Sequence, residues 1–148
     1  MADPNPATNN VAVALTTDRR EVTTPVCNMV APTFLVPDVD STAEWYHTIL
    51  GFQPYLFPKS PPHVYASLCR DHIEIMLLRQ EGYRKPEITR SGGVWDAYVR
   101  VRGLRELYDA VRAKIAVSSE LTKRPYGDSE FEVRDPNGYV LVFAEIIA

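Results

Sequence analysis

Two kinds of apolar spacing alternate along the chain, and together they predict an order of strands and helices. In the first half, runs rich in β-branched and aromatic residues predict four strands, at residues 29–36, 52–57, 63–69 and 72–79. Between the first two runs, apolar residues recur every three or four positions, which predicts an amphipathic helix. The first half is therefore expected to fold as one strand, one helix and three strands.

The residues at the ends of these elements carry their own signals. Ser41 and Glu44 have the spacing of a capping box and are expected to begin the helix. Gly51 is expected to end it, because glycine adopts the left-handed conformation without steric cost. Asp71 is expected in the tight turn of the hairpin between the last two strands.

The second half of the chain repeats the order of the first. Residues 94–101 predict a strand, and Leu104, Leu107, Tyr108 and Val111 have helical spacing. A short strand is expected at residues 115–117, followed by an irregular segment at 118–128. Strands are then predicted at 129–134 and 139–146, joined by a turn whose proline and glycine suit its geometry. The repeat lies in the pattern, and few residues are identical between the halves.

The chain is expected to consist of an arm and one domain with two modules. Residues 1–26 are rich in Asn, Thr, Pro and Ala, and are predicted to form a mobile arm, either disordered or one strand paired with a second chain. The domain, residues 27–148, divides into a first module at 27–80, a polar linker at 81–93 and a second module at 94–148.

Composition narrows the class of protein. At 148 residues, with 45% hydrophobic residues, one core is large enough to fold without disulfides. A net charge of −3 disfavours a nucleic-acid partner. No apolar stretch approaches the roughly 20 residues of a membrane span, and the N-terminus does not resemble a signal peptide. The two cysteines form no metal motif, so a cytoplasmic location is predicted.

Three segments resemble motifs of a known superfamily. They are FLVPDV at residues 34–39, EWYHTILGF at 44–52 and RPYGDSEFEVRDPNGY at 124–139. Together they resemble the glyoxalase, bleomycin-resistance and extradiol dioxygenase superfamily, also called vicinal oxygen chelate proteins. The resemblance implies an α+β fold of two βαβββ modules in a half-open barrel, and a homodimer that exchanges a module or a strand. It implies no single activity, because the fold hosts isomerases, ring-cleaving dioxygenases, thiol transferases and drug-sequestering resistance proteins.

Enzymes of this superfamily hold one divalent ion with His, Glu or Gln side chains from strands that face the cleft. The corresponding positions here are Ala31, Asp96 and Val142, with a fourth near Ile75. Alanine and valine cannot bind a metal ion, and Glu74 faces the cleft only if the register slips by one residue. We therefore predict no metal and no other cofactor.

Strand alternation indicates what such a cleft presents instead. The residues expected to bind a ligand are Thr33, Asp96, Tyr98, Arg100 and Val142. Asp96 would match a cationic group and Tyr98 would offer a stacking surface. In the alternative interpretation, Tyr98 belongs to the core, and Asp96 caps a backbone donor or pairs with Arg100. Trp95, of opposite parity to Asp96, is expected to pack against the helix layer.

The sequence favours a metal-free protein that binds, and sequesters, an aromatic or cationic drug-like compound. No catalytic residue is predicted. Cys69 occupies a strand position at which a small, buried apolar side chain is expected, and no nucleophile motif is present. The alternative is a divalent-metal-dependent lyase, isomerase or ring-cleaving dioxygenase that uses Glu74 and Asp96 as residual ligands. A third possibility is metal-free catalysis with Asp96 as general base.

Overall fold

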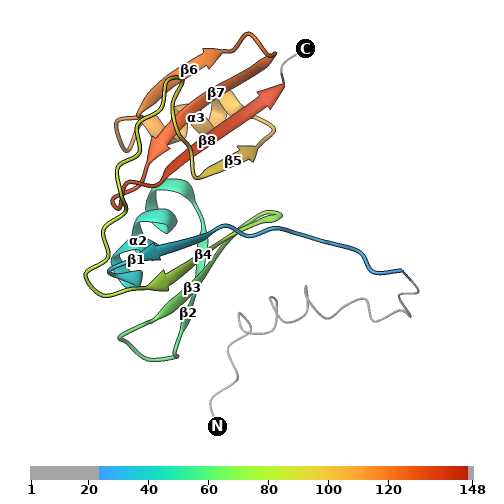
Figure 1. Ribbon diagram of the computed structural model, residues 1–148. Helices are drawn as coiled ribbons and strands as arrows, with labels where there is room; N and C mark the ends of the chain where they lie inside the picture. Colours follow the sequence, from blue (N-terminus) through green and yellow to red (C-terminus); the bar gives the residue numbers. More distant parts are fainter. Residues whose placement is uncertain (1–23, 147–148) are drawn as a thin grey trace.

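The computed structural model describes residues 24–146, and in them the predicted order of elements occurs twice (Figure 1). The first module contains β1 (Thr33–Val36), α2 (Val39–Leu50), β2 (Gln53–Phe57), β3 (Tyr65–Arg70) and β4 (Ile73–Arg79). The second contains β5 (Ala97–Arg100), α3 (Leu104–Arg112), β6 (Ser119–Lys123), β7 (Asp128–Arg134) and β8 (Val140–Ile146). Most of the arm predicted at residues 1–26 lies outside the described residues.

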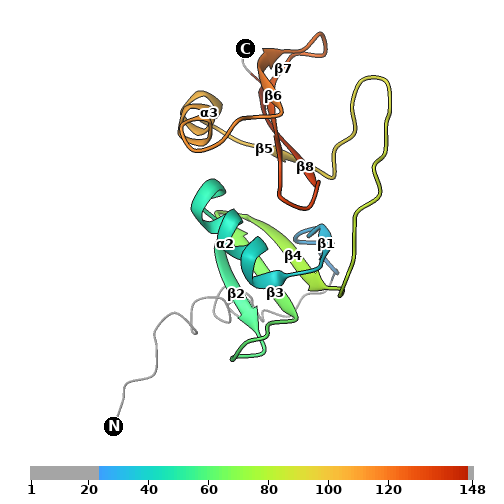
Figure 2. The same cartoon turned by 90° about the vertical axis from the view of Figure 1, so that its left-hand side faces the viewer.

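Each module forms one four-stranded sheet, and the two sheets have equivalent strand orders. The first sheet has the order β1-β4-β3-β2 and the second has the order β5-β8-β7-β6. In each, the first strand pairs in parallel with the last strand of its module, and the other pairs are antiparallel. One helix covers one face of each sheet. In Figure 2, α3 lies on one side of the second sheet and the linker passes on the other. The predicted α+β fold of two βαβββ modules is confirmed.

Two details of the predicted secondary structure are wrong. Residues 115–117 form no strand, and the strand lies instead at Ser119–Lys123, inside the segment expected to be irregular. This edge strand pairs with β7 through a register shift between Ser119 and Thr122. Such a shift interrupts the alternation of apolar and polar residues, which explains why the pattern did not reveal the strand.

The predicted capping box at Ser41 and Glu44 is also wrong. Helix α2 begins three residues earlier than expected, and Asp38 is its N-cap, with Oδ1 accepting a hydrogen bond from the Ser41 backbone N–H at 2.9 Å. Gly51 ends the helix as predicted, with φ of 69°. Helix α3 begins after Gly103, which has no side chain to cap it. The carboxylate of Glu145 on β8 accepts the Gly103 and Leu104 backbone N–H groups instead, at 3.1 and 3.0 Å.

The turn between β7 and β8 fixes the second module to the first. Buried Asp135 accepts the Tyr46 hydroxyl at 2.9 Å and the backbone N–H groups of Asn137 and Tyr139 at 2.8 and 2.9 Å. The Tyr139 ring stacks on Phe34 with centroids 4.1 Å apart, and its hydroxyl donates to the Leu35 carbonyl. Burial raises the pKa of Asp135. We call this contact the Asp135 junction. No helix within residues 24–146 has the length and apolar character needed to cross a membrane.

Candidate functional site

Each sheet has one face that is not covered by a helix of its own module, and we call these the first and second open faces. Strand register and alternation place side chains on them. The first open face carries Thr33, Leu35, Glu74, Met76, Leu78, Tyr65, Ser67 and Cys69. The second carries Tyr98, Arg100, Val140, Val142, Ala144, Asp128, Glu130, Glu132 and Arg134. Asp96 joins the second face just before β5, where its backbone N–H bonds to the Val140 carbonyl.

The predicted ligand-binding residues are divided between these faces. Asp96, Tyr98, Arg100 and Val142 lie together on the second open face. Thr33 lies on the other sheet, exposed beside Met76. Within one chain, the structure therefore brings four of the five residues together. This grouping is determined by which strands pair in each sheet, and the sequence only implied that pairing.

Tyr98 and Arg100 do not stand up from the second sheet but lie across it. The Tyr98 hydroxyl is 2.6 Å from Asp128 Oδ2 and 2.9 Å from Glu130 Oε2, and Arg100 Nη1 donates to Asp128 Oδ1 at 2.7 Å. These contacts join β5 to β7, and β8 lies between those strands. The two side chains therefore cross β8, which explains why Val142 and Ala144 have 0% exposed surface. Val142 can contribute to a site only as its floor.

Residues beyond β6 complete this arrangement. Arg124 Nε donates to Glu130 Oε1 at 2.7 Å, and the Tyr126 hydroxyl donates to Glu130 Oε2 at 2.9 Å. We call the set the Asp128–Glu130 cluster. Its members are Tyr98, Arg100, Arg124, Tyr126, Asp128 and Glu130.

The charges of the Asp128–Glu130 cluster shift its pKa values in consistent directions. Hydrogen bonds from Arg100 and then Tyr98 lower the pKa of Asp128. Hydrogen bonds to Asp128 and Glu130 raise the pKa values of Arg100 and Arg124. Burial, followed by the two carboxylates, raises the pKa of Tyr98, so this phenol stays protonated at neutral pH. Within the cluster, the Asp128 carboxylate is thus ionised beside the Arg100 guanidinium group, and the Tyr98 phenol beside it is neutral.

Four members of this cluster were missed by sequence analysis, namely Arg124, Tyr126, Asp128 and Glu130. The two acids alternate with Ser129 and Phe131 in β7, and this alternation signals a shared face. It does not show that the acids are buried, because the partners Tyr98 and Arg100 are about thirty positions away.

Asp96 has a structural role that matches one branch of the alternative interpretation. Its Oδ2 accepts the Val140 backbone N–H at 2.8 Å and lies 3.5 Å from Lys85 Nζ of the linker. The suggested pairing with Arg100 is wrong, since Arg100 pairs with Asp128. The expectation for Trp95 is also wrong. Its ring lies 5.9 Å from that of Tyr98 and is 42% exposed, so it extends the second open face.

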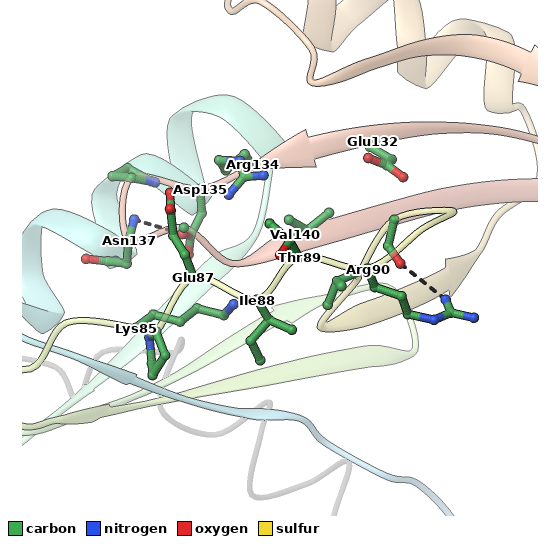
Figure 3. Close-up of a pocket in the computed structure, with 15 residues that line it drawn as sticks. Lys85, Glu87, Ile88, Thr89, Arg90, Glu132, Arg134, Asp135, Asn137 and Val140 are labelled. Atoms are coloured by element: carbon green, nitrogen blue, oxygen red, sulfur yellow. Dashed lines mark hydrogen bonds between the residues drawn. The ribbon is translucent and has the colours of Figure 1, made fainter.

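The linker and one end of the second open face line an open cavity of about 610 Å³. Figure 3 shows Lys85, Glu87 and Arg90 of the linker on one side of the cavity, and Glu132 and Arg134 of β7 on the other. Arg90 Nη1 donates to the Gly93 carbonyl at 3.2 Å, which closes the linker on itself. The cavity lies farther along β7 than the Asp128–Glu130 cluster, and no residue of the cluster lines it.

The residues at the expected metal positions do not fit a metal ion. Ala31 and Val142 have no donor atoms, and Asp96 is occupied by Val140 and Lys85. The register puts Glu74 on the first open face and buries Ile75 under α2, and the Glu74 carboxylate accepts the Ser67 hydroxyl at 2.7 Å. Between residues 24 and 146, no three His, Cys, Asp or Glu side chains are grouped as a metal site would require.

Comparison with known proteins identifies the fold. The family model described as "Glyoxalase/Bleomycin resistance protein/Dioxygenase superfamily" matches residues 28–143. No curated protein matches the sequence. A glyoxalase-related enzyme from Clostridium phytofermentans is similar in structure, with a TM-score of 0.67, 18% identity, and coverage of 85% of this chain and 100% of that one.

Two further solved structures show the same likeness. TioX from Micromonospora sp. ML1 has a TM-score of 0.61 and 20% identity, over 81% of this chain and 97% of its own. The bleomycin-binding protein from bleomycin-producing Streptomyces verticillus, complexed with copper(II)-bleomycin, has a TM-score of 0.56 and 18% identity, over 80% and 97%. At these identities the likeness concerns the fold, in which open sheets of this kind form a half-open barrel.

Proposed function

Because this chain belongs to the Glyoxalase/Bleomycin resistance protein/Dioxygenase superfamily, we propose that it binds and sequesters a planar organic molecule without a metal ion. The site is the second open face, and the observation that carries the proposal is the Asp128–Glu130 cluster. It holds phenol and guanidinium groups in fixed positions, beside exposed aromatic rings, on the sheet face that its own helix leaves free. The donor-poor metal positions support binding over metal-dependent catalysis.

The groups on this face suit a flat ligand. Trp95 is 42% exposed, and its ring lies beside that of Tyr98. Tyr126 is 64% exposed, and its hydroxyl donates to Glu130, the partner of Tyr98. Ligand sites combine such apolar area with a few fixed polar groups. In this proposal Tyr98 and Arg100 contact the ligand, Val142 supports them from beneath, and Asp96 fixes the linker through Lys85. The relative that is complexed with copper(II)-bleomycin shows that a protein of this fold accommodates a drug-sized molecule.

A second copy of the chain is part of the proposal. The first open face exposes apolar side chains, with Leu35 and Leu78 at 37% and 39%, and Phe57, which pairs with Tyr65 on β3, at 62%. Exposed apolar area of this kind is typical of interaction surfaces. We propose a cytoplasmic homodimer in which the first open face of one chain covers the second open face of the other, so that Thr33 reaches the site from the partner. Leu78→Glu is then expected to convert the dimer to a monomer in sedimentation velocity.

Thermal shift and metal analysis test the proposed function together. A panel of planar aromatic compounds should contain ligands that raise the melting temperature, since a ligand that binds only the native state stabilises it. Tyr126→Ala should reduce that shift, and Val64→Ala, which removes exposed apolar area outside the site, should not. After incubation with Mn, Fe, Ni or Zn salts and desalting, no stoichiometric ion should remain. Retention of about one ion per chain, released by Glu74→Ala or Asp96→Ala, would favour the metal-dependent enzyme.

A further inference from the structure

The charged groups of the second open face are arranged in two layers, and the layers differ in sign. The side chains of Asp128 and Glu130 are only 5% and 4% exposed, whereas those of their partners Arg100 and Arg124 are 57% and 32% exposed. The carboxylates therefore form a lower layer that solvent barely reaches. The guanidinium groups lie above them and meet whatever approaches the face.

From this layering we infer that the site selects a planar aromatic anion, such as an aromatic carboxylate, and rejects the corresponding cation. The inference rests on the proposed function and specifies its ligand. It reverses the charge preference expected from the sequence, in which Asp96 would attract a cation. Asp96 is already matched by Lys85, whose own side chain is only 13% exposed.

The arginines retain the donors that an anion needs. A guanidinium group has five N–H donors in a rigid fork, and it binds carboxylates in bidentate fashion. Arg100 and Arg124 each give one hydrogen bond to the acid beneath, through Nη1 and Nε respectively. That bond fixes the guanidinium group before any ligand arrives, so less conformational entropy is lost on binding.

The remaining charges on this face do not alter its outward sign. Lys85 pairs with Asp96, which leaves Glu132 and Arg134 as the other charged residues on the strands. Glu132 is half-buried and Arg134 is exposed. The acids and cations on this face are equal in number. The selectivity for an anion therefore comes from the guanidinium groups, which are the more exposed layer.

Aromatic side chains beside the guanidinium groups explain why the anion should be attached to a flat ring. The Arg100 guanidinium carbon lies 5.3 Å from the centre of the Tyr98 ring, and the Trp95 and Tyr98 rings are 5.9 Å apart. A ring stacked on this surface brings its substituent within reach of Arg100. Aromatic offset stacking and a charge-assisted hydrogen bond then act on one ligand.

Three probes of nearly equal shape test the inference: 2-naphthoate, 2-naphthamide and 2-naphthylmethylammonium. Binding to the full chain is measured by isothermal titration at constant ionic strength, because salt screens exposed charges. We expect 2-naphthoate to bind at least about tenfold more tightly than the amide, and the ammonium compound to bind most weakly. The double variant Arg100→Gln with Asp128→Asn removes one cation and its buried partner together, and it should abolish the preference of the site for the anion. Arg105→Gln, on the exposed face of α3, is the matched control and should keep it.

The outcomes separate the two proposals. Equal binding of all three probes, or tighter binding of the ammonium compound, overturns the anion inference and leaves the proposed function standing. Absence of binding by every probe, together with no shift across the aromatic panel, overturns the proposed function and this inference with it. If the double variant does not fold, the ranking of the three probes on the unmodified chain still decides between these results.

Discussion

The strands of the two sheets pair in equivalent registers, but the side chains that the central strands place on the two open faces differ in size. In the first sheet, Leu78 of β4 lies between Leu35 and Tyr65. At the equivalent place in the second sheet, Ala144 of β8 lies between Arg100 and Glu130. Leu78 is 39% exposed and Ala144 is 0% exposed. A small residue on the central strand lets the long side chains beside it lie flat and meet, whereas a large one keeps its neighbours apart.

In the proposed function, this difference gives the two sheets of one topology different uses. The first open face presents the tops of apolar residues, which lose water favourably when another protein surface covers them. On the second, carboxylates are neutralised beneath guanidinium groups, so a polar ligand meets donors that are already oriented. In our proposal, equivalent backbones therefore support an interface on one sheet and a ligand site on the other, and a few side chains on β4 and β8 determine the difference.

The largest expected effect comes from breaking the Asp135 junction, which holds the two faces in a fixed relation. Asp135→Ala leaves the Tyr46 hydroxyl and the backbone N–H groups of Asn137 and Tyr139 without their buried acceptor. Unpaired buried donors cost about 1–3 kcal/mol each, so we expect a loss of roughly 3 kcal/mol in the free energy of unfolding by urea. Tyr46→Phe removes one donor and should cost about 1 kcal/mol. A loss no larger for Asp135→Ala than for Tyr46→Phe would contradict the role of the junction.

An exchange of sizes between the central strands tests the comparison directly. Ala144→Leu inserts a large side chain beneath Tyr98 and Arg100, and overpacking of this kind costs about 1–3 kcal/mol. In the monomer, Leu78→Ala removes a side chain that is 39% exposed, and should cost only about 1 kcal/mol because little buried area is lost. Urea unfolding at a protein concentration low enough to keep both variants monomeric measures both costs. A cost for Leu78→Ala that exceeds that of Ala144→Leu would show that neighbours, not central-strand size, determine the arrangement.

The order of elements could be predicted from the sequence because it depends on local spacing of apolar residues. The two βαβββ modules and the helix at residues 104–111 follow from such spacing, and the end of α2 follows from the conformational freedom of Gly51. The start of α2 was predicted wrongly at Ser41, since Asp38, three positions earlier, is also a good cap residue. Only the folded backbone shows that Ser41 supplies the N–H and Asp38 the acceptor.

The candidate site was less predictable because its contacts join distant segments. The alternation of side chains along a strand correctly grouped Asp96, Tyr98 and Arg100 on one face. It could not show that Arg100 reaches across β8 to Asp128, or that Lys85 of the linker takes Asp96. The local pattern also could not fix the register of β4 to within one residue, and that register places Glu74 on the first open face. Cross-strand partners are fixed by tertiary packing, and a single sequence does not record them.

The modules also differ in how their helices begin, which gives a third prediction. Asp38 caps α2 from the adjacent residue, whereas Glu145 caps α3 from β8, about forty positions away in the chain. Loss of an N-cap costs about 1 kcal/mol, and Glu145→Ala should cost at least this much because two backbone donors lose one carboxylate. Asp38→Ala should cost about 1 kcal/mol. Hydrogen exchange of the amides in the first turn of each helix locates the loss. Equal exchange rates of the first-turn amides of α3 in the unmodified chain and in Glu145→Ala would show that Glu145 does not cap this helix.

The smallest expected effect is a dependence on pH that belongs to the local cap alone. The hydrogen bond from the Ser41 backbone N–H lowers the pKa of Asp38 below its ordinary value of 3.8. A carboxylate whose pKa is lower in the folded state stabilises that state above its unfolded pKa, and the contribution disappears as the pH falls through the folded value. Asp38→Asn keeps a good cap and removes only the charge. The unfolding free energy of the unmodified chain should therefore exceed that of Asp38→Asn slightly at pH 6, and the difference should shrink as the pH falls below 3.8. Asp71→Asn, in an exposed turn where asparagine also tolerates the positive φ of 49°, is the matched control for the loss of one surface carboxylate. A difference between the unmodified chain and Asp38→Asn that stays constant from pH 6 to pH 2 would mean that the charge of Asp38 does not stabilise α2.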